Sequence, residues 1–429
     1  MLNFLNFMRE SVSNFHAASL IEEILLKNDF HKLEENNYWK LEYAKKYFIK
    51  RNDSSILAFK LPSKKSVLGL NLTTSHLDSP TFKIKPYSLI NDGNYLKLNV
   101  EAYGGPILST WFDKPLSVAG RVIISEDNKL VSKLCYVDKD LLIIPSVPPH
   151  LMPSVQKGKE YNLQIDMLPL LGLNSSFDLK TILAKELKID PEKIVDFDLV
   201  LVNRQRARLG GYNDEFIFSP QLDDLSSAYT CLQGFLSSTN DSFNMYLAFD
   251  NEEVGSLTKQ GAGSTFLKTT LDRISEKLNY TVEERNILLA NSFMLSSDNA
   301  HAVNPNHPEL FDKDNRPYLG QGVVLKYNAN QKYTTDSLSA SYVLSLAKEA
   351  KICIQRYANR SDIRGGSTLG AILLSQVALH SADIGLPQLA MHSSLEVCAT
   401  KDLGDMINLV KTFYDHNLKI SDDKEVVIL

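Results

Sequence analysis

The chain has 429 residues, of which 44% are hydrophobic and 23% are charged, so it is long enough for two or three globular domains with ample cores. Its formal net charge of -5 argues against nucleic acid as the main partner, because phosphate binding needs a basic face. No apolar run reaches membrane-spanning length, no secretory signal is recognisable, and the 4 cysteines are scattered, so we expect a reduced, cytoplasmic protein that is not bound to a membrane.

The first 50 residues have the periodicity expected for helices. Residues 51–54, with the sequence Arg-Asn-Asp-Ser, predict a turn. The apolar runs at residues 55–60 and 67–73 then predict two strands.

A histidine and an aspartate follow the second of these strands. His76 can ligate a metal, while Asp78 can hold the orientation and the tautomer of the imidazole ring. A His-x-Asp pair also forms ordinary loop hydrogen bonds, so the two letters alone are weak evidence. Their position at the end of a strand favours the metal-binding interpretation.

The stretch from residue 84 to residue 214 predicts a β-rich domain inserted into the surrounding one. Its short alternating segments are separated by turn signals that contain glycine, asparagine or proline. Residues 1–83 and 215–429 would then form one discontinuous domain. Within the insertion, four prolines surround His150 and predict a stiff, presented loop. From the residues alone, a structural histidine is the favoured interpretation.

Acidic residues stand at the ends of two further predicted elements. Asp223 and Asp224 lie where a helix should begin, and aspartate commonly caps the free backbone N–H groups there. The apolar run 245–249 predicts a short buried strand, followed by the adjacent Glu252 and Glu253. These carboxylates repel each other unless a bound cation or a shared proton offsets the repulsion. A metal could take one glutamate as a ligand and leave the other as a base, whereas a solvated turn is the simpler alternative.

Asp298 and His392 also follow predicted strands. Because ligands bind at the carboxyl ends of strands in open α/β sheets, we expect all these side chains to meet. Two histidines and three carboxylates are too many for one tetrahedral zinc, but they suit two metals about 3.5–4 Å apart with a bridging carboxylate. Oxygen and imidazole ligands suit Zn²⁺, Mn²⁺ or Co²⁺. An interpretation based on histidines alone would instead place one zinc on His76, His150 and His392.

Five motifs now carry a resemblance to a known family. In chain order, they are Ser75-His-Leu-Asp-Ser-Pro, Gln221-Leu-Asp-Asp, Asp250-Asn-Glu-Glu-Val-Gly-Ser, Ser297-Asp-Asn-Ala-His-Ala and Met391-His-Ser. Together they resemble the signature blocks of the M18 aminopeptidases, the aspartyl aminopeptidase family. The resemblance implies a phosphorylase/hydrolase-like α/β domain of the zinc exopeptidase type, interrupted by a β-rich dimerisation domain. It also implies a homododecamer that removes N-terminal residues, often acidic ones, from peptides with a free N-terminus.

The resemblance also implies a set of metal ligands. His76 and Asp298 would hold one metal ion. Glu253 and His392 would hold the other, and Asp223 would bridge the two ions. We prefer this carboxylate-bridged set to the three-histidine site, because it also accounts for the acidic residues.

Three further residues would act around the metals. Asp78 would orient His76. Glu252 would be the general base, which takes the proton of the attacking water and passes it to the leaving amine. His150 would reach the active site of a neighbouring subunit and contact the scissile carbonyl oxygen.

The chain departs from the family pattern at two places. Asp224 stands where the family usually has asparagine, and we expect it to cap the helix. After Ala302 the chain reads Val-Asn-Pro-Asn, where His-Pro-Asn is more usual, which leaves the metal ligands intact but alters the expected substrate pocket. Lys326 is the candidate for pairing with an acidic substrate side chain, although a surface lysine is the commoner case, and His301 is a candidate pocket wall.

Two other functions share parts of this pattern. A di-metal amidohydrolase or carboxypeptidase would have the same metal chemistry but would bind a carboxylate terminus. A non-catalytic assembly protein would use the metal only to hold its shell together. Glu252 beside Glu253 counts against the second alternative, because a purely structural site needs no spare base.

Overall fold

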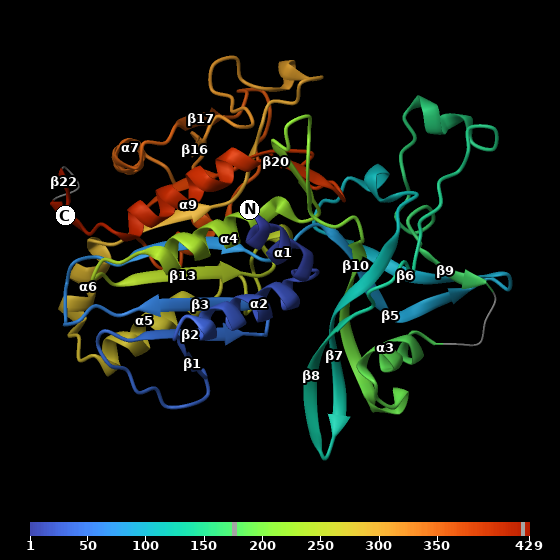
Figure 1. Ribbon diagram of the computed structural model, residues 1–429, viewed down its shortest axis with the longest axis horizontal. Coiled ribbons are helices and arrows are strands. Elements are labelled where there is room, and N and C mark those ends of the chain that lie inside the picture. Colours follow the sequence, from blue (N-terminus) through green and yellow to red (C-terminus); the bar gives the residue numbers. More distant parts are fainter. Residues whose placement is uncertain (174–177, 422–424) are drawn as a thin grey trace.

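The computed structural model describes residues 1–173, 178–421 and 425–429. The chain is a mixed α/β protein whose largest sheet has 9 strands, in the order β1-β2-β3-β13-β4-β14-β18-β16-β17 (Figure 1). These strands are β1 (His31–Leu33), β2 (Lys46–Arg51), β3 (Ser55–Lys60), β4 (Asn71–His76), β13 (Asn244–Phe249), β14 (Phe293–Ser297), β16 (Val323–Tyr327), β17 (Ile354–Ala358) and β18 (His380–Gly385). The neighbouring β13, β4, β14 and β18 are parallel, so their carboxyl ends meet at one edge of the sheet.

Helices cover both faces of this main sheet, and each face has its own apolar core. One core includes residues of α1 (Leu2–Glu10), α2 (Asn14–Lys27), α4 (Leu222–Ser237), α7 (Ser337–Ala350) and α9 (Thr400–Tyr414). The other includes residues of α5 (Phe266–Lys277), α6 (Val282–Ala290) and α8 (Leu369–Leu374). Successive residues of β13 alternate between the two cores, with Tyr246 and Ala248 in the first and Met245 and Leu247 in the second. This burial on both faces explains the unbroken apolar run in the sequence.

A second sheet lies beside the main one and has a core of its own (Figure 1). Its 6 strands have the order β8-β7-β10-β5-β6-β9. They are β5 (Thr81–Asn91), β6 (Tyr95–Tyr103), β7 (Leu116–Glu126), β8 (Lys129–Tyr136), β9 (Leu170–Leu173) and β10 (Ile194–Asn203), and α3 (Leu179–Leu187) contributes to their core. The bounds 84–214 for an inserted dimerisation domain stay a prediction.

Two smaller sheets complete the described part of the chain. A 5-stranded sheet has the order β11-β12-β20-β19-β15, and β21 pairs with β22. Their strands are β11 (Arg208–Gly210), β12 (Phe216–Ser219), β15 (Ala300–His301), β19 (Pro387–Leu389), β20 (Glu396–Ala399), β21 (Leu418–Ser421) and β22 (Glu425–Ile428). Among the residues with described positions, no helix is long and apolar enough to cross a membrane.

Two predicted elements differ from the structure. The helical prediction for residues 1–50 is wrong beyond α2, because β1 and β2 follow, and β2 pairs with β3 across the predicted turn. Short apolar runs of this length do not distinguish a strand from a helix. The strand predicted at residues 67–73 begins only at Asn71. Just before it, Gly69 lies against the backbone of residues 291–292, and the N–H of Leu70 donates to the hydroxyl of Ser292.

Candidate metal centre

The parallel edge of the main sheet carries most of the polar side chains singled out in the sequence. His76 is the last residue of β4, and Asp298 follows the neighbouring β14 directly. Glu252 and Glu253 begin a short 3-10 turn three residues after β13. Asp223 lies in the first turn of α4. The adjacency of these three parallel strands therefore brings residues from distant parts of the sequence together.

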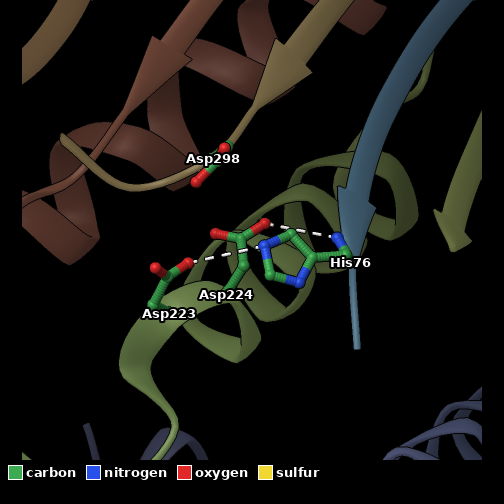
Figure 2. Close-up of side chains that lie close together, drawn as sticks. All are labelled: His76, Asp223, Asp224 and Asp298. Carbon is green, nitrogen blue, oxygen red and sulfur yellow. Dashed lines mark hydrogen bonds and ion pairs between the residues drawn. The ribbon is translucent and has the colours of Figure 1, made fainter. Parts of the chain in front are cut away.

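One group of possible ligands consists of His76, Asp223, Asp224 and Asp298 (Figure 2). One ligand atom from each of these four residues lies within 4.8 Å of those of the other three. All four side chains are buried. The Nε2 atom of His76 is 3.4 Å from Oδ1 of Asp223. Such a buried concentration of oxygen and nitrogen donors is suited to a divalent cation.

A second group lies on the other side of Asp223 and includes Glu253 and His392. The Nε2 atom of His392 is 3.6 Å from Oδ2 of Asp223 and 3.5 Å from Oε2 of Glu253. The two oxygens of Asp223 therefore face two different imidazole rings, since its Oδ1 faces His76. A third overlapping group contains His76, Glu252 and Glu253.

Both imidazole rings are oriented by backbone carbonyl groups. The Nδ1 atom of His76 is 3.0 Å from the carbonyl oxygen of Asp78, and that of His392 is 3.1 Å from the carbonyl oxygen of Gly105. In the neutral imidazole that binds a metal, donation from Nδ1 to a carbonyl leaves Nε2 as the unprotonated atom. Each ring therefore directs its free nitrogen toward Asp223, which is the arrangement of metal-ligating histidines.

Several buried carboxylate oxygens of this cluster accept no hydrogen bond from the protein. Within the described part of the chain, Oδ1 of Asp223, Oδ1 of Asp224 and Oε1 of Glu253 are buried without a hydrogen bond. Buried polar atoms normally have such a bond, and a metal ion supplies the missing interaction. The orphaned oxygens and the oriented imidazoles fit a bound divalent metal.

The pKa values of the cluster reflect this concentration of acids. Burial raises the pKa of Glu252 to about 8. Burial and the charge of Asp223 raise the pKa of Glu253 well above its usual range. Burial lowers the pKa of His76, but the nearby carboxylates of Asp223 and Asp78 outweigh this effect and raise it well above the usual value. Without a cation, the cluster therefore holds protons that a metal would displace.

The expectation that Asp224 caps the helix is wrong. The N-cap residue Gln221 makes no side-chain capping hydrogen bond, and the backbone angles of Asp223 and Asp224 are not helical. Instead, Oδ2 of Asp224 accepts a hydrogen bond of 3.3 Å from the backbone N–H of His76 (Figure 2). The carboxylate that departs from the family pattern thus belongs to this group of possible metal ligands.

A cavity next to the cluster is lined by Lys326 and His301, the two residues that the sequence suggested for substrate contacts. Its lining includes His76, Asp223, Glu252, Glu253, Asp298, Asn299, His301, Lys326, Tyr333, Thr368 and His392. Lys326 is 2% exposed, so the alternative of a surface lysine is wrong. Its Nζ donates to the carbonyl oxygen of Asn299 and is 3.9 Å from Oδ2 of Asp298. His301 is exposed at the cavity wall.

His150 lies apart from these side chains. It is exposed, and none of the metal-ligand groups found among the described residues includes it. A three-histidine site within one chain is therefore not formed. The exposed position leaves His150 accessible to another subunit.

Glu396 is a site residue that the sequence did not reveal. It is 1% exposed in β20, where Oε2 accepts from the backbone N–H of Asp223 at 3.0 Å and Oε1 accepts from that of His392 at 2.8 Å. One carboxylate thus ties together the backbones of two possible ligands. The only signal in the sequence is an acid four residues after a histidine, which is too common to be informative.

Fold and cluster together define a class, the metal-dependent hydrolases with an α/β fold. The family model described as "Aminopeptidase I zinc metalloprotease (M18)" matches residues 7–414. A "Probable M18 family aminopeptidase 2" of Clostridium novyi is 42% identical over 421 residues, covering 96% of this chain and 97% of that protein. "Aspartyl aminopeptidase 1" of Schizosaccharomyces pombe is 37% identical over 447 residues, covering 97% and 94%.

Solved structures show the same relationship. The mApe1 dodecamer of S. cerevisiae superposes with a TM-score of 0.85 at 26% identity, covering 97% of this chain and 96% of that one. The chain belongs to the M18 family of aminopeptidases, which are metal-dependent hydrolases.

Proposed function

We propose that this chain is a di-metal aminopeptidase that hydrolyses the N-terminal residue from peptides. The observation that carries the proposal is the position of Asp223, whose two oxygens face the imidazoles of His76 and His392 on opposite sides. A carboxylate in this position can bridge two ions. His76 and Asp298 would hold one ion, and Glu253 and His392 would hold the other.

When bound, two divalent ions would supply Lewis-acid chemistry, which lowers the pKa of a water and stabilises negative charge on a carbonyl oxygen. Glu252 lines the cavity beside the ligands and would take the proton of the attacking water, then pass it to the leaving amine. Asp78 accepts from the backbone N–H groups of Glu252 and Glu253 at 3.1 Å each. It would therefore hold the general base Glu252 and the metal ligand Glu253 in position, in addition to orienting His76.

Zn²⁺ is the metal that the family description names, and the donor set agrees with it. Oxygen and imidazole donors also suit Mn²⁺ and Co²⁺.

All 4 cysteines are free thiols, so none of them forms a disulfide. Free thiols support the expected cytoplasmic location.

A preference for acidic N-terminal residues would rest on Lys326. The side chain is buried, lines the cavity, and has its Nζ 3.9 Å from Asp298, so its charge lies beside the proposed metals. A substrate carboxylate that reached this ammonium group would gain a charge-assisted hydrogen bond in a poorly hydrated place. The S. pombe relative is called an aspartyl aminopeptidase, which supports this preference. His301 would form the outer wall of the same pocket.

Self-association would complete the active site. His150 is exposed on a loop that prolines stiffen, and we propose that it contacts the scissile carbonyl oxygen in a neighbouring subunit. The S. cerevisiae relative forms a dodecamer, which supports the same homododecameric assembly for this chain.

Paired substrates test the proposal. Arylamides of single amino acids are compared with their N-acetylated forms, after metal removal and after addition of Zn²⁺, Mn²⁺ or Co²⁺. An aminopeptidase will cleave only the free-amine forms, and only with metal present. Preferential cleavage of the acetylated forms would instead identify an amidohydrolase. Metal-loaded protein that cleaves neither form, but loses its assembly on chelation, would identify a structural metal site.

A further inference from the structure

The end of β6 in the second sheet touches the metal centre at three consecutive residues. Tyr103 is the last residue of the strand, and Gly104 and Gly105 follow it. Tyr103 contacts Asp78 after β4, Gly104 lies against Glu253 after β13, and Gly105 contacts His392 after β19. The chain at the end of β6 therefore supports His76, by way of Asp78, as well as Glu253 and His392.

Tyr103 acts on Asp78, the residue that orients His76. Its hydroxyl donates to Oδ2 of Asp78 at 2.7 Å and accepts from Nδ2 of Asn251 at 2.8 Å. Asp78 also accepts from the backbone N–H groups of Glu252 and Glu253. The phenol is thus the one donor to this carboxylate that comes from the second sheet, among the described contacts.

Gly104 acts through its lack of a side chain. It has a φ of +69°, and a Cβ atom there would lie 3.1 Å from Cβ of Glu253 and 3.3 Å from its Oε2. A side chain at residue 104 would therefore crowd the carboxylate of Glu253, a proposed metal ligand, and would have to displace it slightly.

Gly105 acts on the second histidine. Its carbonyl oxygen is the acceptor 3.1 Å from Nδ1 of His392. Two residues further on, the backbone N–H of Ile107 donates to the carbonyl oxygen of His392 at 2.9 Å. Both the ring and the backbone of His392 are thus held by the chain that leaves β6, while the ring's Nε2 faces Asp223 and Glu253.

We propose that the segment Tyr103–Gly105 is a positioning element of the metal centre, through which the second sheet sets the geometry of both proposed metal sites. Tyr103 is its positioning residue for His76 by way of Asp78, and Gly105 is its positioning residue for His392. The inference rests on the proposed metal sites but adds a role for residues that contact neither metal nor substrate. Partners of this kind change metal affinity by about 10–100-fold when they are removed.

Tyr103→Phe removes the hydroxyl and leaves the ring in place. The matched control is Tyr136→Phe, because Tyr136 is the last residue of β8 in the same sheet and its hydroxyl accepts from Arg204, away from the metal cluster. Zn²⁺ affinity is measured on the full chain by competition with a chromophoric chelator. We expect about 10-fold weaker binding or more in Tyr103→Phe and no change in the control. Equal affinities for the two variants would overturn the proposal.

A glycine pair provides a second test that does not depend on a buried hydroxyl. Gly104→Ala would push a methyl group against Glu253, whereas Gly93→Ala meets nothing within 4 Å and has a comparable left-handed backbone, with φ of +94° against +69°. The Co²⁺ absorption spectrum of each variant reports the coordination geometry. We expect an altered spectrum only for Gly104→Ala, and a spectrum like that of the wild type would contradict the role of this segment. Wild-type protein that binds no metal would instead defeat the proposed function itself.

Discussion

Glu396→Gln will separate the positioning of the metal ligands from ordinary packing. The wild-type carboxylate accepts two backbone hydrogen bonds, from His392 at 2.8 Å and from Asp223 at 3.0 Å. Glutamine has nearly the same shape but only one oxygen, so its NH₂ group must face one of these N–H groups. One buried donor will then lack an acceptor, which costs about 1–3 kcal/mol.

Asp402→Asn is the matched control, because Asp402 is also a buried carboxylate that accepts from two backbone N–H groups. Asp402 lies on α9, and its two oxygens accept from the backbone N–H groups of Gly322 at 2.8 Å and Gly320 at 2.7 Å. None of the described metal-ligand groups includes it. The substitution leaves the same deficit of one acceptor. Both variants should therefore lower the melting temperature of the metal-free protein by similar amounts.

Metal affinity will distinguish the two variants. The backbone of Asp223 or His392 will shift only in Glu396→Gln, and we expect the Zn²⁺ dissociation constant to rise about 10–100-fold there. This corresponds to about 1.4–2.8 kcal/mol of binding free energy. Chelator competition on both variants measures the effect. If Glu396→Gln loses thermal stability but binds Zn²⁺ as tightly as Asp402→Asn, the positioning role of Glu396 is refuted.

Three further predictions concern specificity, acid stability and the metal. Lys326→Ala should lower kcat/KM for peptides that begin with Asp or Glu more than for neutral ones, and equal losses would remove its role in specificity. Burial lowers the pKa of His16 from 6.5 to about 4. Because the unfolded chain binds this proton more readily, stability should rise between about pH 4 and pH 6.5, by about 3 kcal/mol at most, and urea titrations of His16→Gln should show a flatter rise. Chelation should abolish turnover and lower the melting temperature, and added Zn²⁺ should restore both; turnover that survives chelation would exclude a metal mechanism.

The sequence was most informative where a strand ends. His76, Glu253 and Asp298 lie at neighbouring strand ends because parallel strands place their carboxyl ends at one edge, so three separate motifs predict one place. The limits of β4 and the strand character of β2 were missed, because they depend on pairing with chain segments far away in the sequence or on close backbone contacts.

The supporting residues could not be predicted in the same way. Glu396 and Tyr103 act through backbone N–H groups and through Asp78, so their role exists only in three dimensions. Asp224 was misinterpreted for the opposite reason, since an aspartate at a predicted helix start has a common local explanation. Its non-helical backbone directs the carboxylate to His76 instead.

Turnover by Glu252→Gln is the most direct test of the central claim. Glutamine keeps the size of Glu252 and can still lie beside His76 and Glu253, but it cannot accept the proton of the attacking water. With metal content verified to equal that of the wild type, we predict that kcat falls by about 10²–10⁴-fold on a free-amine peptide. Near-normal turnover by the fully metal-loaded variant would contradict the account of this site.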